Sequence, residues 1–552
     1  MKKKSLFIFL FVAPLISYSQ WNGNTSINTA VCVQQNDQLD ARIVTDGRGG
    51  AIITWLDFRN DGTQTFGDIF SQRMDKNGIA KWTAGGVAIC TDPSSQTSPT
   101  IVEDGNGGAI IAWNEWRNGD RDIYAQKIDS SGVVQWTANG VSVVAKTSQQ
   151  QDPKIISDGA GGAIIVWQDS VNGAFDIYAQ RLSSSGATMW AANGSAICTA
   201  VLAQVNPKIE SDRVGGAIIT WQDKRNGTDY DIYAQRVNQG GIVQWAANGV
   251  PVCSASGTQS NPKIEPDGAG GVYIGWQDKR NGNDYDIYAN RLNSSGIVQW
   301  NTNGSAVSVE SGNQSAVDMT SDGIDGVILT WKDDRNGPFD IYFQRADSNG
   351  VMRFSLGGNS MPLANFSQIN PNIIGDGVGG AVIVWQDSTS AGWDIQSGRI
   401  DTGGAILWTS LVGTATDDQT NPKNVPDGNG GAIFTWQDMR NTNDLNIYAH
   451  HLNSDGTVNG IQEKNTYVET RCFPNPMSGS ALIEISNPGY NISPGSCALN
   501  VFDVSGKIVH PYVRSTSKGF FISRQDLANG IYFYEIRSNN NVLSRGKLIL
   551  NY

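Results

Sequence analysis

Six regularly spaced arginines are the residues of this sequence best suited to binding chemistry. Each stands two positions after an acidic residue, which in turn stands two positions after a tryptophan. Guanidinium groups form paired hydrogen bonds with carboxylates and sulfates, so a cluster of them suits an anionic ligand. The six are Arg59, Arg117, Arg225, Arg280, Arg335 and Arg440.

The acidic residues of the same pattern allow a second chemistry, because paired carboxylates hydrolyse glycosidic bonds. Residues two positions apart share one face of a strand, so Asp–Arg ion pairs within the scaffold are the simpler interpretation. No pair stands out from the others, and we predict no catalytic residue. The acids are Asp57, Glu115, Asp169, Asp223, Asp278, Asp333, Asp387 and Asp438.

An internal repeat positions all of these residues. The first tryptophan of the pattern recurs every 50 to 58 residues or so, in eight copies. Each unit contains four strand-like runs separated by glycine turns such as Asp-Gly-x-Gly-Gly and Arg-Asn-Gly, which is typical of a propeller blade. The tryptophans are Trp55, Trp113, Trp167, Trp221, Trp276, Trp331, Trp385 and Trp436.

The eighth unit lacks the second tryptophan of the pattern, because the count from Asn446 reaches Gly460. Trp21 is the spare copy, and Cys32 behind it matches the repeated Cys90, Cys198 and Cys253, which we expect to be buried apolar side chains. The sequence therefore predicts an all-β, eight-bladed β-propeller over residues 20–460, closed by the N-terminal strand.

Propeller geometry would place the arginines on one face, together with the varied turns that follow them and the start of each inner strand. Aromatic side chains suit sugar rings, and we expect Trp116, Tyr230, Tyr285 and Trp393, with Phe175 and Phe339, to rim a basic funnel. The alternative is that these residues only complete exposed loops. The inner strands begin with the basic residues Arg42, Lys154, Lys208, Lys263 and Lys423.

Several function classes lack support. The net charge of −12 argues against nucleic acid and anionic lipid as partners. We find no HExxH, GxSxG, P-loop or zinc-type cysteine spacing and predict neither a cofactor nor a metal. His450 and His451 replace the Gln-Arg of other units, so divergence of the repeat explains them.

Both ends of the chain carry export features. Lys2 to Lys4, an apolar run to Ile16 and Ser17-Tyr18-Ser19 form a secretory signal peptide, residues 1–19, and no transmembrane segment follows. After a polar linker at 461–470, residues 471–552 alternate apolar residues with turn residues, which indicates a small β-sandwich. Cys472 and Cys497 are its plausible disulfide pair.

The last segment resembles the C-terminal sorting domain of proteins exported by the type IX secretion system of Bacteroidetes-type bacteria. The resemblance implies that the secretion machinery is a partner and that the chain is secreted or held at the cell surface. The matching residues are Phe473, Pro474, Asn475, Pro476, Gly506, Lys507, Gly530, Tyr532 and Lys547. The propeller repeat is also similar to TolB-type repeats, which implies propeller geometry and no activity.

Together these features favour an exported binding or adhesion module that uses a propeller face, for an anionic glycan or a surface protein. The alternative is a polysaccharide-active hydrolase or lyase with its site at the propeller centre. An enzyme should show one deep central pocket where unmatched acids converge, whereas a binding module should show a nearly symmetric ring.

Overall fold

The computed structural model describes residues 21–171, 173–440, 444–458, 469–486, 497–504, 506–525, 527–538 and 541–551. The predicted signal peptide and most of the predicted linker lie outside these residues. The described part is built from β-strands, and it contains no helix long and apolar enough to cross a membrane. The chain divides into two compact units, Met1–Gly460 and Ile461–Tyr552.

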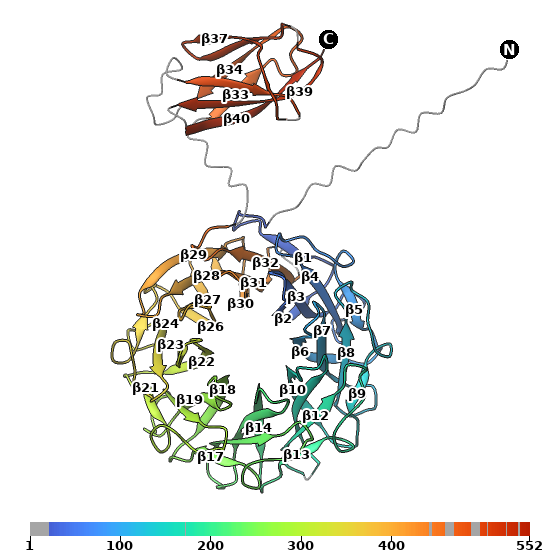
Figure 1. Ribbon diagram of the computed structural model, residues 1–552, viewed down its shortest axis with the longest axis vertical. Helices are drawn as coiled ribbons and strands as arrows, with labels where there is room; N and C mark the ends of the chain where they lie inside the picture. Colours follow the sequence, from blue (N-terminus) through green and yellow to red (C-terminus); the bar gives the residue numbers. More distant parts are fainter. Residues whose placement is uncertain are drawn as a thin grey trace, which may run out of the picture. The chain divides into compact units, whose positions relative to one another are not determined.

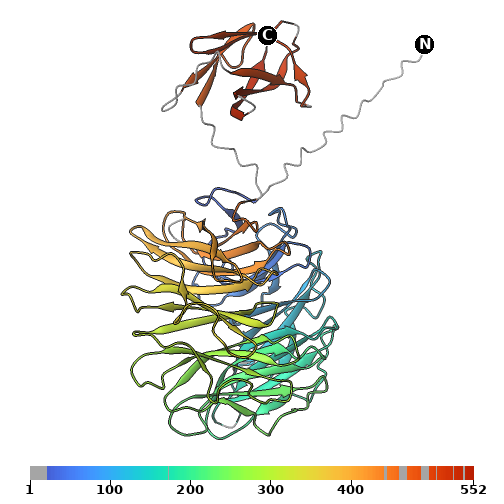
Figure 2. The same ribbon diagram turned by 60° about the vertical axis from the view of Figure 1, so that its left-hand side comes forward.

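The first unit is a ring of four-stranded antiparallel sheets around a central opening (Figure 1), and Figure 2 shows neighbouring sheets packed face to face. Eight such sheets lie within its described residues. The innermost strands are β2 (Gln38–Thr45), β6 (Gln96–Glu103), β10 (Gln150–Ser157), β14 (Gln204–Ser211), β18 (Gln259–Pro266), β22 (Gln314–Ser321), β26 (Gln368–Gly375) and β30 (Gln419–Pro426).

The second strands are β3 (Ala51–Asp57), β7 (Ala109–Glu115), β11 (Ala163–Asp169), β15 (Ala217–Asp223), β19 (Val272–Asp278), β23 (Gly326–Asp333), β27 (Ala381–Thr389) and β31 (Ala432–Asp438). The third strands are β4 (Asp68–Met74), β8 (Asp122–Ile128), β12 (Asp176–Leu182), β16 (Asp231–Val237), β20 (Asp286–Leu292), β24 (Asp340–Asp347), β28 (Gly392–Ile400) and β32 (Asn446–Leu452). The outer strands are β1 (Thr29–Cys32), β5 (Val87–Cys90), β9 (Val141–Val144), β13 (Ser195–Cys198), β17 (Val250–Cys253), β21 (Ser305–Ser308), β25 (Asn359–Ser360) and β29 (Ile406–Gly413).

The second strands form the core because they are buried on both faces. All seven residues of β15, AIITWQD, are buried, which explains why its apolar residues run on instead of alternating. The Asp-Gly-x-Gly-Gly turn before the second strand is equally constrained. In its β14–β15 variant, Asp212 Oδ1 accepts from the amide of Gly216 at 2.7 Å, and a Cβ on Gly216 would lie 2.2 Å from the carbonyl oxygen of Val237.

The second tryptophan of the repeat unit, which follows the third strand, joins neighbouring sheets. The indole Nε1 of Trp190 donates to the carbonyl of Gln239 in the next sheet at 2.9 Å, and the same contact recurs from Trp82, Trp136, Trp245, Trp300 and Trp408. The four cysteines Cys32, Cys90, Cys198 and Cys253 are buried, as expected.

The N-terminal segment supplies the outer strand of the last sheet. Strand β1 pairs antiparallel with β32, in the order β1-β32-β31-β30. Trp21 is 1% exposed, stacks on His451 with ring centroids 5.9 Å apart, and donates from Nε1 to the carbonyl of Lys76 in the first sheet at 2.9 Å. Trp21 thus makes the contact that the repeated tryptophans make between other sheets.

The two histidines of the last sheet serve packing. His451 Nε2 lies 2.9 Å from Asp427 Oδ2, where other sheets pair an arginine or lysine with the turn aspartate. Burial, together with the neighbouring His451, lowers the pKa of His450 to about 4, so this ring is neutral at physiological pH.

The second unit consists of two four-stranded sheets, which agrees with the predicted sandwich. One has the order β33-β34-β38-β37 and the other β36-β35-β39-β40. Cys472 and Cys497 both pack against their shared core, and their pairing stays a prediction. The strands are β33 (Glu469–Phe473), β34 (Ser480–Ser486), β35 (Ala498–Phe502), β36 (Ile508–Val509), β37 (Tyr512–Thr516), β38 (Gly519–Ser523), β39 (Gly530–Ser538) and β40 (Asn541–Leu550).

Candidate functional site

The six predicted arginines are committed to contacts within the ring. Arg225 pairs with the fully buried Asp223 through Nε (2.9 Å) and Nη2 (2.6 Å), and it donates to the carbonyl of Asn248 at 2.7 Å. Its guanidinium lies 3.8 Å from the centre of the Tyr233 ring. The same acid, carbonyl and aromatic partners recur at Arg59, Arg117, Arg280 and Arg335, and Arg440 holds its acid, Tyr448 and the carbonyl of Ile27.

The two sheets that lack the arginine keep a donor on the acid. Lys146 Nζ pairs with Asp169 Oδ2 at 2.9 Å and lies over the Tyr178 ring. Gln396 Nε2 donates to Asp387. The buried acid is therefore the element that requires a partner, and the ligand role of the six arginines stays a prediction.

We expect Arg225→Leu to destabilise the protein by about 3–5 kcal/mol, because it leaves the buried Asp223 carboxylate without its ion-pair partner. Urea denaturation followed by tryptophan fluorescence measures this loss. The double variant Asp223→Asn/Arg225→Leu should recover part of it, since no buried charge remains unpaired. Equal stability of wild type and Arg225→Leu would contradict the structural role.

Of the predicted aromatic residues, Trp116, Tyr230 and Tyr285 lie in the turns between second and third strands, whereas Trp393 is the second residue of β28, and all four are partly exposed. Arg121 covers the Trp116 ring at 4.2 Å, while Lys224 and Lys279 lie over Tyr230 and Tyr285 at 5.6 and 5.4 Å. The carbonyl of Tyr230 also accepts from the amide of Gln259 in the next sheet. These four residues, Trp116, Tyr230, Tyr285 and Trp393, are absent from the lining of the cavity described next, and their ligand role stays a prediction.

A ring of eight side chains lies at one level of the central channel. Each of these residues pairs with the equivalent residue of the neighbouring second strand, so all eight occupy the same position of their inner strands. Lys208, for example, pairs with Thr220, and Lys423 pairs with Thr435. Five of the eight are basic and one is acidic. The ring consists of Arg42, Thr100, Lys154, Lys208, Lys263, Asp318, Asn372 and Lys423.

Carboxylates neutralise only three of these five cations. Arg42 pairs with Asp40 at 2.6 Å, Lys154 pairs with Asp152, and Lys263 pairs with Asp318 at 2.9 Å. The Lys208 ammonium donates to the neutral Asn206 Oδ1 and to the carbonyl of Pro207, and the Lys423 ammonium makes no hydrogen bond or ion pair with a described residue. Two ammonium groups of the channel therefore lack a carboxylate partner within the described part of the ring.

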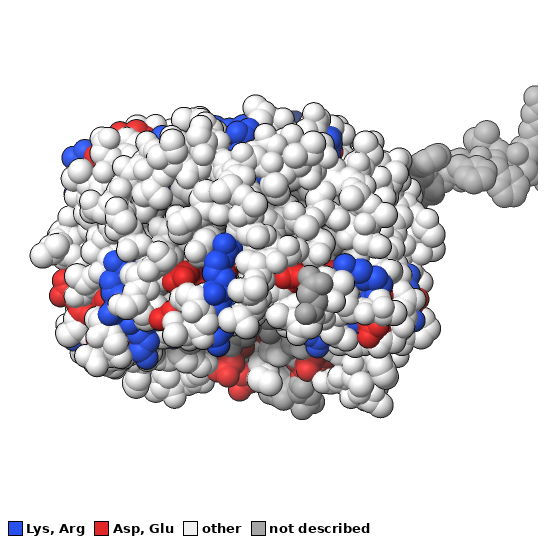
Figure 3. All heavy atoms as spheres, turned by 90° about the horizontal axis from the view of Figure 1, so that it is seen from below, with Lys and Arg blue, Asp and Glu red and all other residues white. Residues whose placement is uncertain are grey.

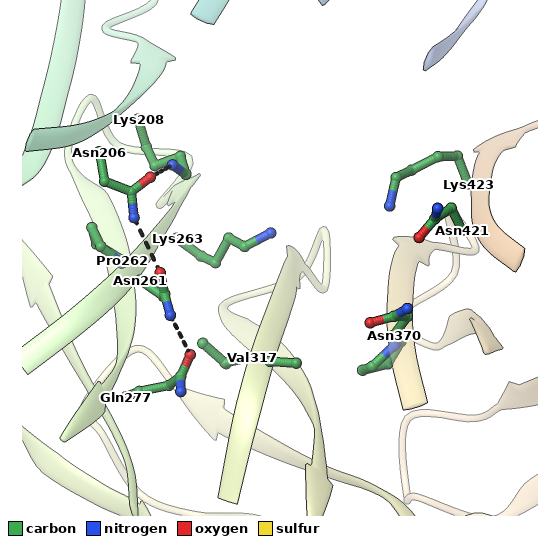
Figure 4. A pocket seen from close by; sticks show the side chains of 12 residues that line it. Asn206, Lys208, Asn261, Pro262, Lys263, Gln277, Val317, Asn370, Asn421 and Lys423 are labelled. Carbon is green, nitrogen blue, oxygen red and sulfur yellow. Dashed lines mark hydrogen bonds between the residues drawn. The ribbon is translucent and has the colours of Figure 1, made fainter. Parts of the chain in front are cut away.

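These lysines converge on a cavity of about 280 Å³ at one end of the channel. Figure 4 shows Lys208 and Lys263 on one side and Lys423 on the other; the ammonium groups of Lys263 and Lys423 are directed inward, and that of Lys208 lies against Asn206. The inner strands begin at this end, where the second strands end, so the cavity shares a face with the arginine turns. Its lining residues are Asn206, Lys208, Asn261, Pro262, Lys263, Gln277, Ala316, Val317, Asn370, Pro371, Asn421 and Lys423.

Neighbouring cations in the channel disfavour the charged form of Lys208 and Lys423. Burial, together with Lys154 and Lys263, lowers the pKa of Lys208 to about 7. Burial, with Arg42 and Lys263, lowers the pKa of Lys423 to about 8. An anion bound between the two lysines would favour their charged forms and offset both the burial and the repulsion, so the cavity favours a negatively charged ligand.

The opposite end of the channel is different. Glu210 and Glu265 occupy equivalent positions two residues beyond the lysines, and burial raises the pKa of both, that of Glu265 to about 8. The outer edge of the ring is a separate surface, seen in Figure 3. Lys and Arg are interspersed there with Asp and Glu, so this outer edge presents no continuous basic surface.

Sequence reasoning identified the lysines at the inner strands but missed the asparagines beside them. Asn206, Asn261, Asn370 and Asn421 each begin an Asn-Pro-Lys or Asn-Pro-Asn run, and each has a positive φ of 51° to 56°. The repeated tripeptide was the available signal. Its meaning depends on a bulge in the inner strand, which the letters do not reveal.

Comparison with known proteins identifies the C-terminal unit and little else. No curated protein matches the chain. Similar solved structures include a protein of unknown function from Dyadobacter fermentans DSM 18053 (10% identity, 57% of this chain and 96% of that chain, TM-score 0.34). Others are the NanB sialidase from Streptococcus pneumoniae (10%, 78% and 71%, 0.32) and an α-L-arabinofuranosidase from Fusarium graminearum (9%, 66% and 94%, 0.34).

Residues 471–551 match the family model of the secretion system C-terminal sorting domain. This match confirms the resemblance drawn from the motifs. The chain is therefore a protein that type IX secretion exports to the cell surface or the medium, with a secretion system C-terminal sorting domain at residues 471–551.

Proposed function

We propose that residues 20–460 form a closed eight-bladed propeller that binds an anionic group of a glycan in its central channel, at the cell surface or in the medium. The closure is supported by the pairing of β1 with β32 and by Trp21, which contacts both the last and the first sheet. The binding role rests on one observation: Lys208, Lys263 and Lys423 converge on one cavity, and two of them lack a carboxylate partner.

This proposal relocates the ligand from the arginine turns to the channel on the same face. The arginines hold buried acids, whereas Lys208 and Lys423 carry charge that no carboxylate among the described residues pairs with. Clusters of unpaired cations in a concave site raise the local concentration of anions. Arg225 and its counterparts would then support the ring that positions the lysines.

Binding is favoured over the hydrolase or lyase alternative by the composition of the cavity. Glycoside hydrolysis uses two carboxyl groups on either side of the scissile bond. The described residues that line the cavity include no carboxyl group, and the nearby Asp318 pairs with Lys263. The site can hold an acid but lacks the groups that would cleave a glycosidic bond.

Anion affinity should rise as pH falls from 9 to 6. The pKa values of Lys208 and Lys423 are about 7 and about 8. At pH 9 both side chains are therefore neutral in most molecules, and at pH 6 both are charged in most molecules. Sulfate keeps its charge throughout this range, so isothermal titration calorimetry of the mature chain with sulfate isolates the protein's own titration. We expect affinity to increase at least about tenfold from pH 9 to pH 6. An affinity that does not vary with pH would refute the lysine site.

A further inference from the structure

The asparagines at the channel mouth have a fixed orientation. Gln437 Oε1 already accepts from the backbone amide of Asp40 (3.1 Å), so it can face Asn421 only as an acceptor, and Asn421 turns its Nδ2 to it at 3.2 Å. Gln386 Oε1 holds Asn370 Nδ2 in the same way while accepting from the amide of Asn421 at 2.9 Å. The carbonyl oxygens of Asn370 and Asn421 are thereby left for the channel.

Those two oxygens accept no hydrogen bond from a described residue. Figure 4 shows them directed toward the middle of the channel, on the side of Lys423. Each asparagine precedes the ring position of its own strand by two residues and so lies nearer the mouth. The cavity therefore has two layers, with hydrogen-bond acceptors at the mouth and ammonium donors below them.

The layers differ between the two halves of the ring. In the sheets of β2 and β10 the position of the asparagine is taken by Asp40 and Asp152, whose carboxylates neutralise Arg42 and Lys154. In the sheets of β14, β18, β26 and β30 it is an asparagine, and the cavity lies against this half. The side chains at this position therefore differ between the two halves of the ring, although the backbone is the same in every sheet.

A ligand that matches both layers must donate hydrogen bonds at one end and carry negative charge at the other. A plain carboxylate would use the lysines and leave the asparagine oxygens unmatched, and a neutral sugar would leave the ammonium groups uncompensated. At about 280 Å³ the cavity lies at the small end of ligand pockets, which suits one ring and not several.

We propose that the cavity takes a single acidic sugar unit, such as a uronic acid at a glycan end, with its carboxylate against Lys208, Lys263 and Lys423 and its hydroxyl groups donating to Asn370 and Asn421. This inference rests on the proposed anion-binding function and adds the class of ligand. The lowered pKa values of Lys208 and Lys423 agree with it, because a carboxylate bound beside them raises both pKa values and is then paired with fully protonated ammonium groups.

The test compares glucuronate with cyclohexanecarboxylate, which keeps the ring and the acid but lacks the hydroxyl groups. Calorimetry on the mature chain at pH 6.5 should give glucuronate the higher affinity by about tenfold, since two or more neutral hydrogen bonds are added. Asn370→Ala/Asn421→Ala should abolish that difference and leave cyclohexanecarboxylate binding unchanged. Alanine is tolerated at this backbone position, because Ala316 occupies it with a φ of 54°.

The control variant is Ser98→Ala, at the equivalent position on the other half of the ring, which should change neither affinity. If both acids bind equally well to wild type, or if the asparagine variant keeps the preference for glucuronate, the sugar-acid assignment is wrong while the anion site stands. If neither acid binds wild type, the anion site itself is wrong.

Discussion

A chain that lacks residues 20–32 should melt at a markedly lower temperature than the full mature chain and aggregate at concentrations where the full chain stays monomeric. The deletion removes β1 and Trp21, and with them the outer strand of the last sheet. It exposes the edge of β32, and an unpaired edge strand is a template for association between molecules.

The size of the effect follows from the contacts that are lost. Trp21 is almost fully buried and joins the last sheet to the first, and replacing a buried tryptophan by alanine costs about 3–5 kcal/mol. The segment also receives hydrogen bonds from Arg440 at Ile27 and Asn28, while Asn28 donates to the carbonyl of Val412 at 2.7 Å. The deletion removes all of these together.

The point variant Trp21→Ala separates ring closure from general loss of chain, and Trp116→Ala is its matched control. Trp116 is not one of the recurring tryptophans, it is partly exposed, and its indole makes no hydrogen bond to a described residue of a neighbouring sheet. Differential scanning calorimetry should show a large decrease in Tm for Trp21→Ala and a small one for Trp116→Ala. Unchanged melting of the deletion variant would show that the N-terminal segment does not close the ring.

The double variant Lys208→Met/Lys423→Met should lose acid binding and yet be more stable than wild type at neutral pH. Both lysines have a folded-state pKa below the ordinary value of 10.5. The unfolded chain therefore binds more protons between about pH 7 and pH 10, and wild-type stability rises with pH through that window. Methionine keeps most of the side-chain volume and removes the penalty for the charge.

Calorimetric melting at pH 7 should give the double variant a Tm at least about 2 °C above wild type, with the difference shrinking toward pH 10. A site kept for function at the expense of stability predicts this result. A purely structural role for the lysines predicts the reverse, a Tm below wild type. Lys81→Met is the control, because Lys81 lies between a third strand and an outer strand, away from the channel lysines, and pairs with Asp75, so its loss should not stabilise the protein.

The repeated four-stranded sheets could be predicted from the sequence because they depend on residue types with narrow structural roles, such as buried tryptophans and turn glycines. Four-stranded sheets packed around tryptophans and glycine turns that exclude a Cβ follow from steric and apolar demands that repeat along the chain, while closure of the ring by Trp21 stays a proposal. The four buried cysteines follow from the same periodicity. The sorting domain was predictable because its motifs occur together and in order.

The site was harder to predict, because the sequence does not show which cations are already paired. Arg225 and Lys423 look equally available as letters, yet Arg225 holds a buried carboxylate and Lys423 has no described partner. The distinction depends on contacts between sheets that are far apart in sequence. The orientation of Asn421 likewise depends on Gln437 and on a backbone amide almost 400 residues away.

The most direct test of the lysine site is the number of protons taken up when glucuronate binds. Titration calorimetry of the mature chain at pH 7.5, in two buffers with different enthalpies of ionisation, gives that number. Binding between Lys208 and Lys423 predicts a net uptake of protons that disappears in Lys208→Met/Lys423→Met. Binding without proton uptake, or with the same uptake in the double variant, would contradict it.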